Sequence, residues 1–283
     1  MYCPQCSLTF LFLRERKKQT FTFLYIYDNI GSMNTQNSIN IKNVLAETPF
    51  GTVVTAKKLA SMGVSRGLVR SYEKTGWLKR LANGAYTRLE ESVDINGALY
   101  ALQNDCGLHV HQGAHSALKN LYAKMHYAKD ENAMHLFAGA GTKLPAWFKS
   151  AYGGQYVLHL TNFLPPDAGL TRHNEATFSL QVPTLERALL EMLYLVPDSV
   201  TVQEAYSITE TVMSVKTNDM QFLLERCNSV KVKRLLLCFA ENAGLQWFDA
   251  LDVQRIDLGS GVRSLSKGGK LYEKYNLVIP ELG

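Results

Sequence analysis

Three short helices are predicted in the first third of the chain from the spacing of its apolar side chains. Residues 39–45, 56–62 and 66–75 each repeat apolar positions three or four apart, as an amphipathic helix does. The apolar positions of the first helix are Ile39, Ile41, Val44 and Leu45. Thr55 and Ser65 precede the second and third helices, and both residue types are good helix N-caps. The pattern therefore gives the second and third helices defined starts.

The third predicted helix has two different faces. Leu68, Val69 and Tyr72 fall on one side and are expected to face a core. The opposite stripe is basic, with a cation at every fourth position: Arg66, Arg70 and Lys74. A helix of this length fits the major groove of DNA, where an arginine can donate two hydrogen bonds to a guanine.

A hairpin pattern comes directly after the third helix. Residues 77–81 and 85–88 alternate as strands do, and Ala82-Asn83-Gly84 supplies a tight turn. Gly63, between the second and third helices, suits the left-handed conformation that a sharp turn needs. Helix, glycine turn, helix and hairpin in this order predict a winged helix-turn-helix.

Basic residues are concentrated in this same segment. Residues 53–88 carry eight Lys and Arg against a single acidic residue, Glu73, so their net charge is +7. The whole chain carries +5 and residues 1–32 carry +2, which leaves the rest at −4. Such a footprint suits a polyanion, because neutralising phosphates releases condensed counterions. We therefore predict a double-stranded DNA-binding module; a winged helix that binds only proteins is the alternative.

The predicted DNA contacts come from two helices and the hairpin. Cations at the start of the second helix can reach the DNA backbone, and those on the hairpin can straddle a phosphate or enter the minor groove. The full predicted set is Thr55, Lys57, Lys58, Ser65, Arg66, Arg70, Ser71, Lys74, Lys79, Arg80 and Arg88.

The rest of the chain mixes helices and strands without a repeat. Helices are expected over residues 95–103, 115–122, 183–193, 202–215, 220–227 and 230–242. Strands are expected over residues 108–111, 133–137, 156–160, 177–182, 256–258, 262–265 and 276–279. The expected fold class is α+β: a winged helix-turn-helix over residues 33–92, then a mixed α/β C-terminal domain with a helical part over residues 93–283.

Residues 1–32 differ in character from the rest of the chain. Their apolar stretches are interrupted by a charged run, an order that a secretory signal does not have. We interpret them as a disordered leader or a start-site artefact, with translation starting at Met33. No apolar run approaches the ~20 residues of a membrane helix. Five scattered cysteines, including a lone Cys-x-x-Cys at Cys3 and Cys6, favour reduced thiols in the cytoplasm over a zinc site.

Several further patterns resemble catalytic or ligand-binding motifs. The serine-hydrolase pattern at residues 63–67 comes after a helix, whereas that motif needs a strand before it. The glycine-rich turn at residues 139–143 lacks the phosphate-loop spacing. The Asp/Glu-x-Lys pattern of restriction-type nucleases occurs only at Glu15-Arg16-Lys17, inside the leader. We therefore expect no catalytic residues and no cofactor.

Two residue clusters remain open. A metal could be held by His109, His111 and His115, although histidines with hydrogen-bond partners at a strand end are the preferred interpretation, because two of three ligands at a regular spacing are a weak signal of a metal site. The late basic cluster could contact nucleic acid or a partner's nucleotide site, or be a solvated face; its members are Arg263, Lys267, Lys270 and Lys274.

The chain from about Met33 onward resembles the AbiEi antitoxins. The likeness is carried by Gly63-Val64-Ser65, Val69-Arg70, residues 74–81 and Gly84-Ala85-Tyr86, and further on by residues 108–118, 135–139 and 144–148. The resemblance implies an antitoxin of a bicistronic type IV toxin–antitoxin (abortive infection, phage defence) system. It implies a winged helix that represses the operon at inverted repeats in the promoter. It also implies a C-terminal domain that counters a nucleotidyltransferase-like toxin without an obligatory stable complex. A DNA-targeted enzyme acting on nucleic acid or nucleotides is the alternative.

Overall fold

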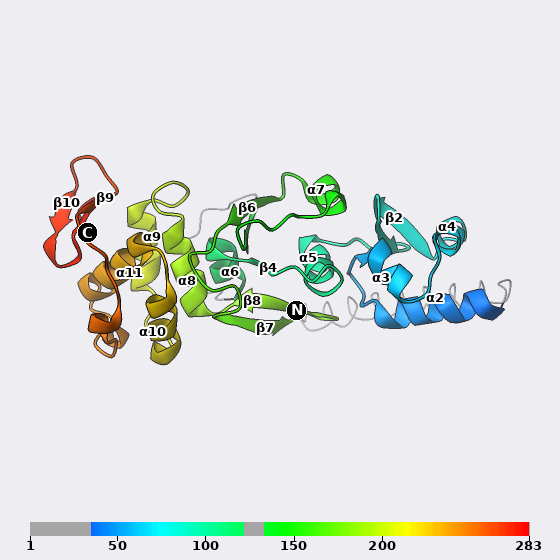
Figure 1. The fold of residues 1–283 in the computed structure, drawn as a ribbon, viewed down its shortest axis with the longest axis horizontal. Helices are drawn as coiled ribbons and strands as arrows, with labels where there is room; N and C mark the ends of the chain where they lie inside the picture. Colours follow the sequence, from blue (N-terminus) through cyan, green and yellow to red (C-terminus); the bar gives the residue numbers. More distant parts are fainter. Residues whose placement is uncertain (1–34, 122–132, 283) are drawn as a thin grey trace, which may run out of the picture.

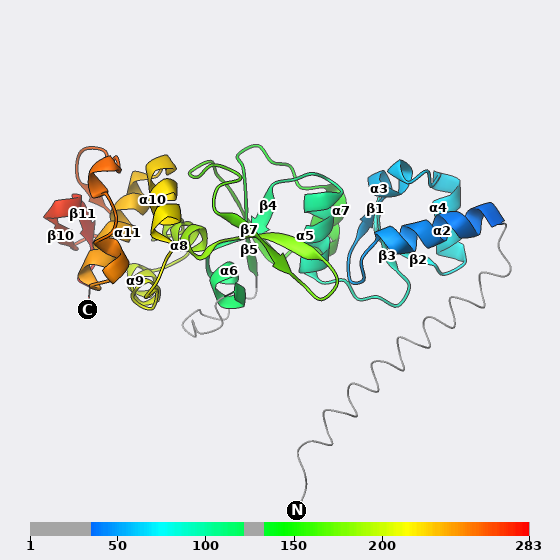
Figure 2. The same cartoon turned by 90° about the horizontal axis from the view of Figure 1, so that it is seen from below.

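The computed structural model describes residues 35–121 and 133–282 and arranges them as three parts along an elongated molecule (Figure 1). The winged helix-turn-helix lies at one end, small sheets and helices lie in the middle, and a helical part lies at the other end (Figure 2). The leader predicted over residues 1–32, with Cys3, Cys6 and the Glu15-Arg16-Lys17 pattern, lies outside the described residues.

The first part has the predicted helices and hairpin. Its elements are α2 (Thr35–Glu47), β1 (Val54–Thr55), α3 (Ala56–Ser61), α4 (Arg66–Lys74), β2 (Leu78–Ala82) and β3 (Ala85–Arg88). β3 lies between β1 and β2 and is antiparallel to both. The expected winged helix is therefore confirmed, with α2 starting four residues before the predicted position.

The core of this part contains the predicted apolar positions. The buried side chains from its helices and strands are Ile41, Val44, Val54, Leu59, Val64, Val69, Tyr72, Trp77, Leu78 and Tyr86. Thr55 Oγ1 accepts a hydrogen bond from Lys58 N at 3.1 Å, and Ser65 Oγ accepts one from Leu68 N at 3.2 Å. These are the two predicted N-caps, and each satisfies an amide that a helix start leaves without a partner.

The middle part contains two separate small sheets. Its elements are α5 (Ile95–Asn104), β4 (Val110–Gln112), α6 (Ala114–Leu121), β5 (Met134–Ala138), α7 (Ala146–Tyr152), β6 (Tyr156–Leu160), β7 (Leu170–Asn174) and β8 (Ser179–Pro183). β5 lies between antiparallel β4 and parallel β6, and β7 pairs with β8 in a second sheet. The sequence did not predict α7 or β7. α7 is only seven residues long, and most side chains of β7 are exposed and polar, so neither shows a clear apolar period.

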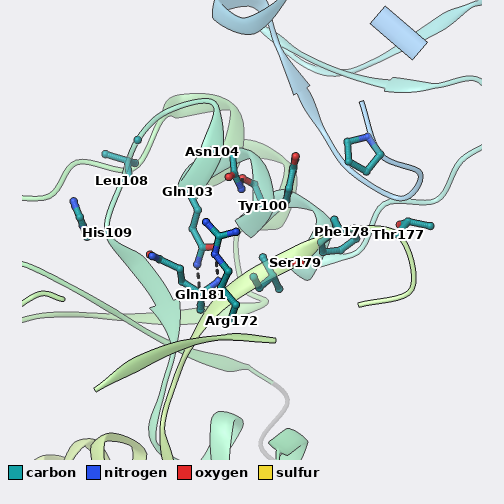
Figure 3. A pocket seen from close by; sticks show the side chains of 13 residues that line it. Tyr100, Gln103, Asn104, Leu108, His109, Arg172, Thr177, Phe178, Ser179 and Gln181 are labelled. Carbon is teal, nitrogen blue, oxygen red and sulfur yellow. Dashed lines mark hydrogen bonds between the residues drawn. The ribbon is translucent and has the colours of Figure 1, made fainter. Parts of the chain in front are cut away.

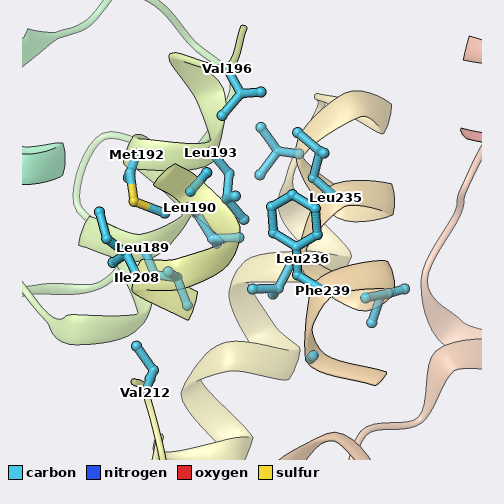
Figure 4. Close-up of a cluster of buried hydrophobic side chains, with 14 of the residues drawn as sticks. Leu189, Leu190, Met192, Leu193, Val196, Ile208, Val212, Leu235, Leu236 and Phe239 are labelled. Carbon is cyan, nitrogen blue, oxygen red and sulfur yellow. The ribbon is translucent and has the colours of Figure 1, made fainter. Parts of the chain in front are cut away.

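The last part packs helices around a continuous apolar core. Its elements are α8 (Leu185–Tyr194), α9 (Val202–Glu210), α10 (Thr217–Arg226), α11 (Val230–Asn242), the 3₁₀ turns η1 (Gln246–Phe248), η2 (Val253–Arg255) and η3 (Glu273–Tyr275), and the strands β9 (Arg263–Ser264), β10 (Lys270–Tyr272) and β11 (Leu277–Ile279). Leucines of α8 and α11 meet in its centre (Figure 4). Within the described residues, every helix falls short of the length and apolar character that a membrane crossing needs.

Three predictions about residues 183–258 were wrong. The helix expected over residues 202–215 ends at Glu210 and an irregular segment follows it. Pro183 does not open a helix: it ends β8 opposite Leu170, and Thr184 caps α8 instead. Residues 256–258 form no strand, because η2 and a turn bring Ile256 into the helical core without a pairing partner. Apolar residues mark burial in these places, and burial does not distinguish a helix or strand from an irregular segment.

The winged helix-turn-helix touches the middle part backbone to backbone. Gly97, in the first turn of α5, lies against the turn between α2 and β1, so that a Cβ on Gly97 would stand 1.8 Å from Gly51 O and 2.8 Å from Val93 Cγ1. Val53 N donates to Gly97 O at 3.4 Å across the same junction. Only glycine permits this approach.

We expect Gly97→Ala to lower the free energy of unfolding by about 1–3 kcal/mol, because the added methyl group overpacks the junction. Gly67→Ala on α4 is the matched control, since its Cβ would meet only Ser65 Oγ at 3.8 Å. Urea denaturation of both variants checks the prediction, and equal effects of the two would contradict it.

Candidate nucleic-acid interface

The predicted recognition helix is α4, and its local structure explains its orientation. Val69 and Tyr72 are buried, which holds one face of the helix against the core. Gly63 turns the chain between α3 and α4 with a φ of +79°. Ser65 caps the helix, so the serine-hydrolase pattern around it is part of a helix-turn-helix. α4 therefore turns a defined opposite face to solvent.

That opposite face carries the predicted basic stripe. Arg66, Arg70 and Lys74 are all exposed. In Figures 1 and 2, α4 lies in the end of the molecule far from the C-terminal part, which does not cover it. Among the described residues, Arg66 and Lys74 have no ion-pair partner. The three cations are thus accessible along one helix edge.

One acidic residue on α4 binds a cation of the hairpin. Arg80 Nε and Nη2 donate to the two carboxylate oxygens of Glu73 at 2.8 and 2.9 Å. The hydrogen bond from Arg80 lowers the pKa of Glu73. The guanidinium also lies 5.4 Å from the centre of the Tyr86 ring. Arg80 is therefore exposed but already paired, whereas neighbouring Lys79 is exposed and has no ion pair within the described residues.

The start of α3 presents one accessible cation. Lys57 is exposed, and Lys58 is half-buried with its Nζ 3.3 Å from Glu47 Oε2. Thr55 is buried, and its backbone amide donates to Asp105 Oδ2 at 3.1 Å. The predicted DNA contact through Thr55 is therefore corrected: its hydroxyl caps α3 and is not available to a ligand. Ser65 is exposed and Ser71 half-buried.

Arg88 also departs from the prediction. Its Nη2 donates to Leu45 O and Thr48 O at the end of α2, and its guanidinium lies 4.2 Å from the centre of the Phe50 ring. Burial lowers the pKa of Arg88. The side chain thus ties the hairpin to α2, because the carbonyls at a helix C-terminus need donors. It is a structural cation and not a surface contact.

The strand ends beside the hairpin turn are partly covered, while Asn83 in the turn is exposed. Leu81 and Ala82 of β2 pack against the buried cluster of the middle part, where β2 contacts α7, and Ala85 is fully buried in that cluster. Gly84 O accepts a hydrogen bond from Ala56 N at 2.8 Å. The hairpin therefore packs on the rest of the molecule on both sides of its turn, and its exposed cations are Lys79 and Arg80.

The remaining sequence candidates have separate partners. His109 pairs with Asp167, His111 with Glu191, and His115 lies 3.6 Å from Glu204, so the three histidines do not converge. In the late basic cluster, Lys270 pairs with Glu281 and Lys274 with Glu241, and Arg263 and Lys267 are exposed. The turn over residues 139–143 is closed by hydrogen bonds from Ala140 N to Asn162 Oδ1 at 2.8 Å and from Thr142 N to Gly139 O at 3.0 Å.

A cavity of about 480 Å³ lies beside the winged helix-turn-helix (Figure 3). Its walls come from the C-terminal end of α5, the loop after it, the β7–β8 hairpin and Pro49. Arg172 is its exposed cation. Apart from His109, no residue of its lining stands out in the sequence, since segments far apart in the chain form the cavity and none contains a motif.

The fold and the exposed basic edge of α4 together define a winged helix-turn-helix protein of the transcription-regulator class. Residues 37–129 match the N-terminal domain of AbiEi antitoxin transcriptional regulators, and residues 131–280 match the AbiEi antitoxin of type IV toxin–antitoxin systems. The chain therefore belongs to the AbiEi antitoxin family of transcriptional regulators, as its residue pattern predicted.

A solved structure supports the fold. The RV2827C protein of Mycobacterium tuberculosis is similar with a TM-score of 0.50 and 14% sequence identity, over 87% of this chain and 92% of that one. No curated protein matches the sequence significantly.

Proposed function

We propose that this protein represses its own operon by binding inverted repeats in the promoter through α4. The observation that carries the proposal is the exposed stripe of Arg66, Arg70 and Lys74 on a capped helix whose opposite face is buried. Lys57 and Lys79 are exposed on the adjoining α3 and β2 and would contact phosphates. We expect the protein to act in the cytoplasm, where its proposed DNA target lies.

The test is binding to the DNA upstream of its own coding sequence. A labelled duplex of that promoter should be shifted at lower protein concentration than a scrambled duplex of equal length. Affinity should fall steeply as salt rises, because phosphate contacts release counterions. Equal affinity for the two duplexes would overturn sequence-specific repression.

We further propose that the C-terminal two parts counter a nucleotidyltransferase-like toxin, without an obligatory stable complex and without a catalytic step. The support is membership of a family of antitoxins that act as transcriptional regulators. The product of the adjacent gene, expressed alone, is expected to arrest growth, and co-expression of this protein should restore it. An Arg66→Ala/Arg70→Ala variant should still restore growth, because those side chains lie on the DNA-binding helix. If a folded variant failed to restore growth, the proposal that the C-terminal two parts counter the toxin independently of the DNA-binding helix would be overturned.

A substitution of Glu73 tests the same interface through an expected gain of promoter affinity instead of a loss. We expect Glu73→Gln to tighten promoter binding and to steepen its salt dependence by about one ion, because it removes the acidic residue of α4 and frees Arg80 for a phosphate. Fluorescence anisotropy at several salt concentrations measures both quantities. Glu210→Gln, at the exposed end of α9, is the control and should change neither. Weaker promoter binding by Glu73→Gln would show that the Glu73–Arg80 pair orients the interface.

A further inference from the structure

The cavity beside the winged helix-turn-helix has the chemistry of an anion site. Among the described residues that line it, none carries a carboxylate. Arg172 projects from the exposed strand β7, and no ion pair or hydrogen bond engages its guanidinium within the described chain. Figure 3 shows Arg172 beside Gln103 and Gln181 on one wall. A guanidinium in this setting is suited to a phosphate or carboxylate, to which it can donate two parallel hydrogen bonds.

A second wall of the cavity is aromatic. The Tyr100 and Phe178 rings lie with centroids 5.4 Å apart at 58° and are half-buried. The two rings are tilted against each other, and the face of either ring is a surface on which a planar ring can stack. Asn104 Nδ2 donates to Tyr100 O at 2.9 Å, which leaves the carbonyl oxygen of its side chain to accept a hydrogen bond. A ligand with an aromatic ring and polar ring edges matches this wall.

Hydrogen bonds preorganise the first wall, beside Arg172. Gln103 Nε2 donates to Val110 O and Gln181 O at 2.8 and 3.0 Å, and Gln103 Oε1 accepts from Gln181 N at 2.9 Å. The amide of Gln103 therefore fastens α5 to both β4 and β8. The cavity volume lies within the range of ~300–1,000 Å³ found for small-molecule sites, which often form where domains meet.

We propose that this cavity binds a nucleoside monophosphate, with its phosphate on Arg172 and its base against Tyr100 and Phe178. The two halves of such a ligand match the two walls: an anion for the guanidinium of Arg172, and a planar heterocycle for the aromatic pair. Inorganic phosphate would use only the first wall, and a nucleoside only the second.

The cavity walls also hold the winged helix-turn-helix in place. Thr177 Oγ1, on the cavity wall, donates to Phe50 O at 2.6 Å. Asp105, next to the lining residue Asn104, accepts the amide of Thr55 at the start of α3. Pro49 itself lines the cavity. A nucleotide that contacts these segments changes the freedom of the DNA-binding part, and so its operator affinity. This coupling rests on the proposed function.

Titration calorimetry without DNA tests the site. AMP, GMP, CMP and UMP are the probes, with the nucleosides and inorganic phosphate as separate arms. We expect saturable binding of at least one nucleotide, at least about tenfold tighter than its nucleoside or phosphate alone. Arg172→Gln should weaken it by about tenfold or more. Arg263→Gln is the matched control, an exposed arginine of the far part, and should leave it unchanged.

Three results of this titration would overturn the site: no saturable binding of any nucleotide, binding as tight for phosphate alone, or binding that Arg172→Gln leaves intact. Promoter binding with and without the best nucleotide then tests the coupling, and we expect at least about a fivefold change in affinity that Arg172→Gln removes. An unchanged promoter affinity overturns the coupling. Failure of the protein to bind the promoter at all overturns the proposed function, while the titration still decides the nucleotide site.

Discussion

Replacing Arg66 and Arg70 together by alanine is expected to weaken promoter binding by about a hundredfold or more. Each side chain that reads a base contributes about 1–3 kcal/mol, and the two lie one helical turn apart on the same exposed edge of α4. The loss should be largest for the promoter duplex and smaller for a scrambled duplex, because base contacts carry specificity whereas phosphate contacts act on any sequence.

The double variant should fold normally. Neither side chain contributes to the buried cluster of the winged helix-turn-helix, whose α4 members are Val69 and Tyr72 with Leu68 packed against them. Anisotropy titrations of wild-type and variant protein against both duplexes measure the effect, and thermal denaturation confirms the fold. Promoter affinity within about threefold of the wild type would show that another surface reads the DNA.

A second double variant separates the effect of losing two positive charges from the effect of losing them on α4. Arg263→Ala/Lys267→Ala removes the same two positive charges from exposed residues of the C-terminal part. If the basic edge of α4 is the interface, this control should bind the promoter as the wild type does. A comparable loss in the control would instead assign DNA contact to the late basic cluster.

Local signals explain why the winged helix-turn-helix could be predicted. Caps at Thr55 and Ser65, the turn at Gly63 and the apolar period of α4 each act within a few residues, so the sequence alone contains them. The exposure of Arg66, Arg70 and Lys74 results from the same period. These features determine the helix that the structure presents to solvent.

The errors at the same site have long-range causes. Arg88 binds carbonyls of Leu45 and Thr48, some 40 positions earlier, and nothing beside Arg88 in the sequence reveals this. The strand ends beside the wing turn are partly covered because α7, far downstream, packs on β2. The cavity likewise joins α5 to the β7–β8 hairpin. Tertiary contacts of this kind determine which cations of a basic segment remain exposed and unpaired. The local sequence pattern does not contain that information.

The largest expected effect on stability lies in the middle of the molecule. Glu191 of α8 is completely buried, and its Oε1 lies 2.7 Å from His111 Nε2 and 2.8 Å from Arg187 Nε. Arg187 Nη1 in turn donates to Pro165 O at 2.9 Å. The cluster therefore joins β4, α8 and the loop before β7. We expect Glu191→Ala to lower the free energy of unfolding by about 3–5 kcal/mol, because the arginine would remain buried without its counter-ion.

Glu186→Gln on the same helix is the control for Glu191→Ala. Glu186 is also buried, but its Oε1 accepts the amide of Lys216 at 2.8 Å and pairs with no cation among the described residues, and a glutamine oxygen can keep that hydrogen bond. Glu186→Gln should therefore lower the free energy of unfolding by only about 1 kcal/mol. Urea denaturation at neutral pH compares the two, and a loss of less than about 1 kcal/mol in Glu191→Ala would show that the cluster is not a net source of stability.

The pH dependence of stability gives the cluster an independent signature. Burial by itself would raise the pKa of Glu191, but His111 and Arg187 together outweigh burial and lower it. A carboxyl group whose pKa is lower in the folded state stabilises the fold above its unfolded pKa of about 4.3, and loses that contribution as pH falls through the folded value. Wild-type stability should therefore drop below about pH 4.3 more steeply than that of Glu191→Gln, which has no proton to take up at this position. Parallel acid profiles of the two proteins would mean that Glu191 does not anchor the buried charges, because a carboxylate held by an arginine must resist protonation.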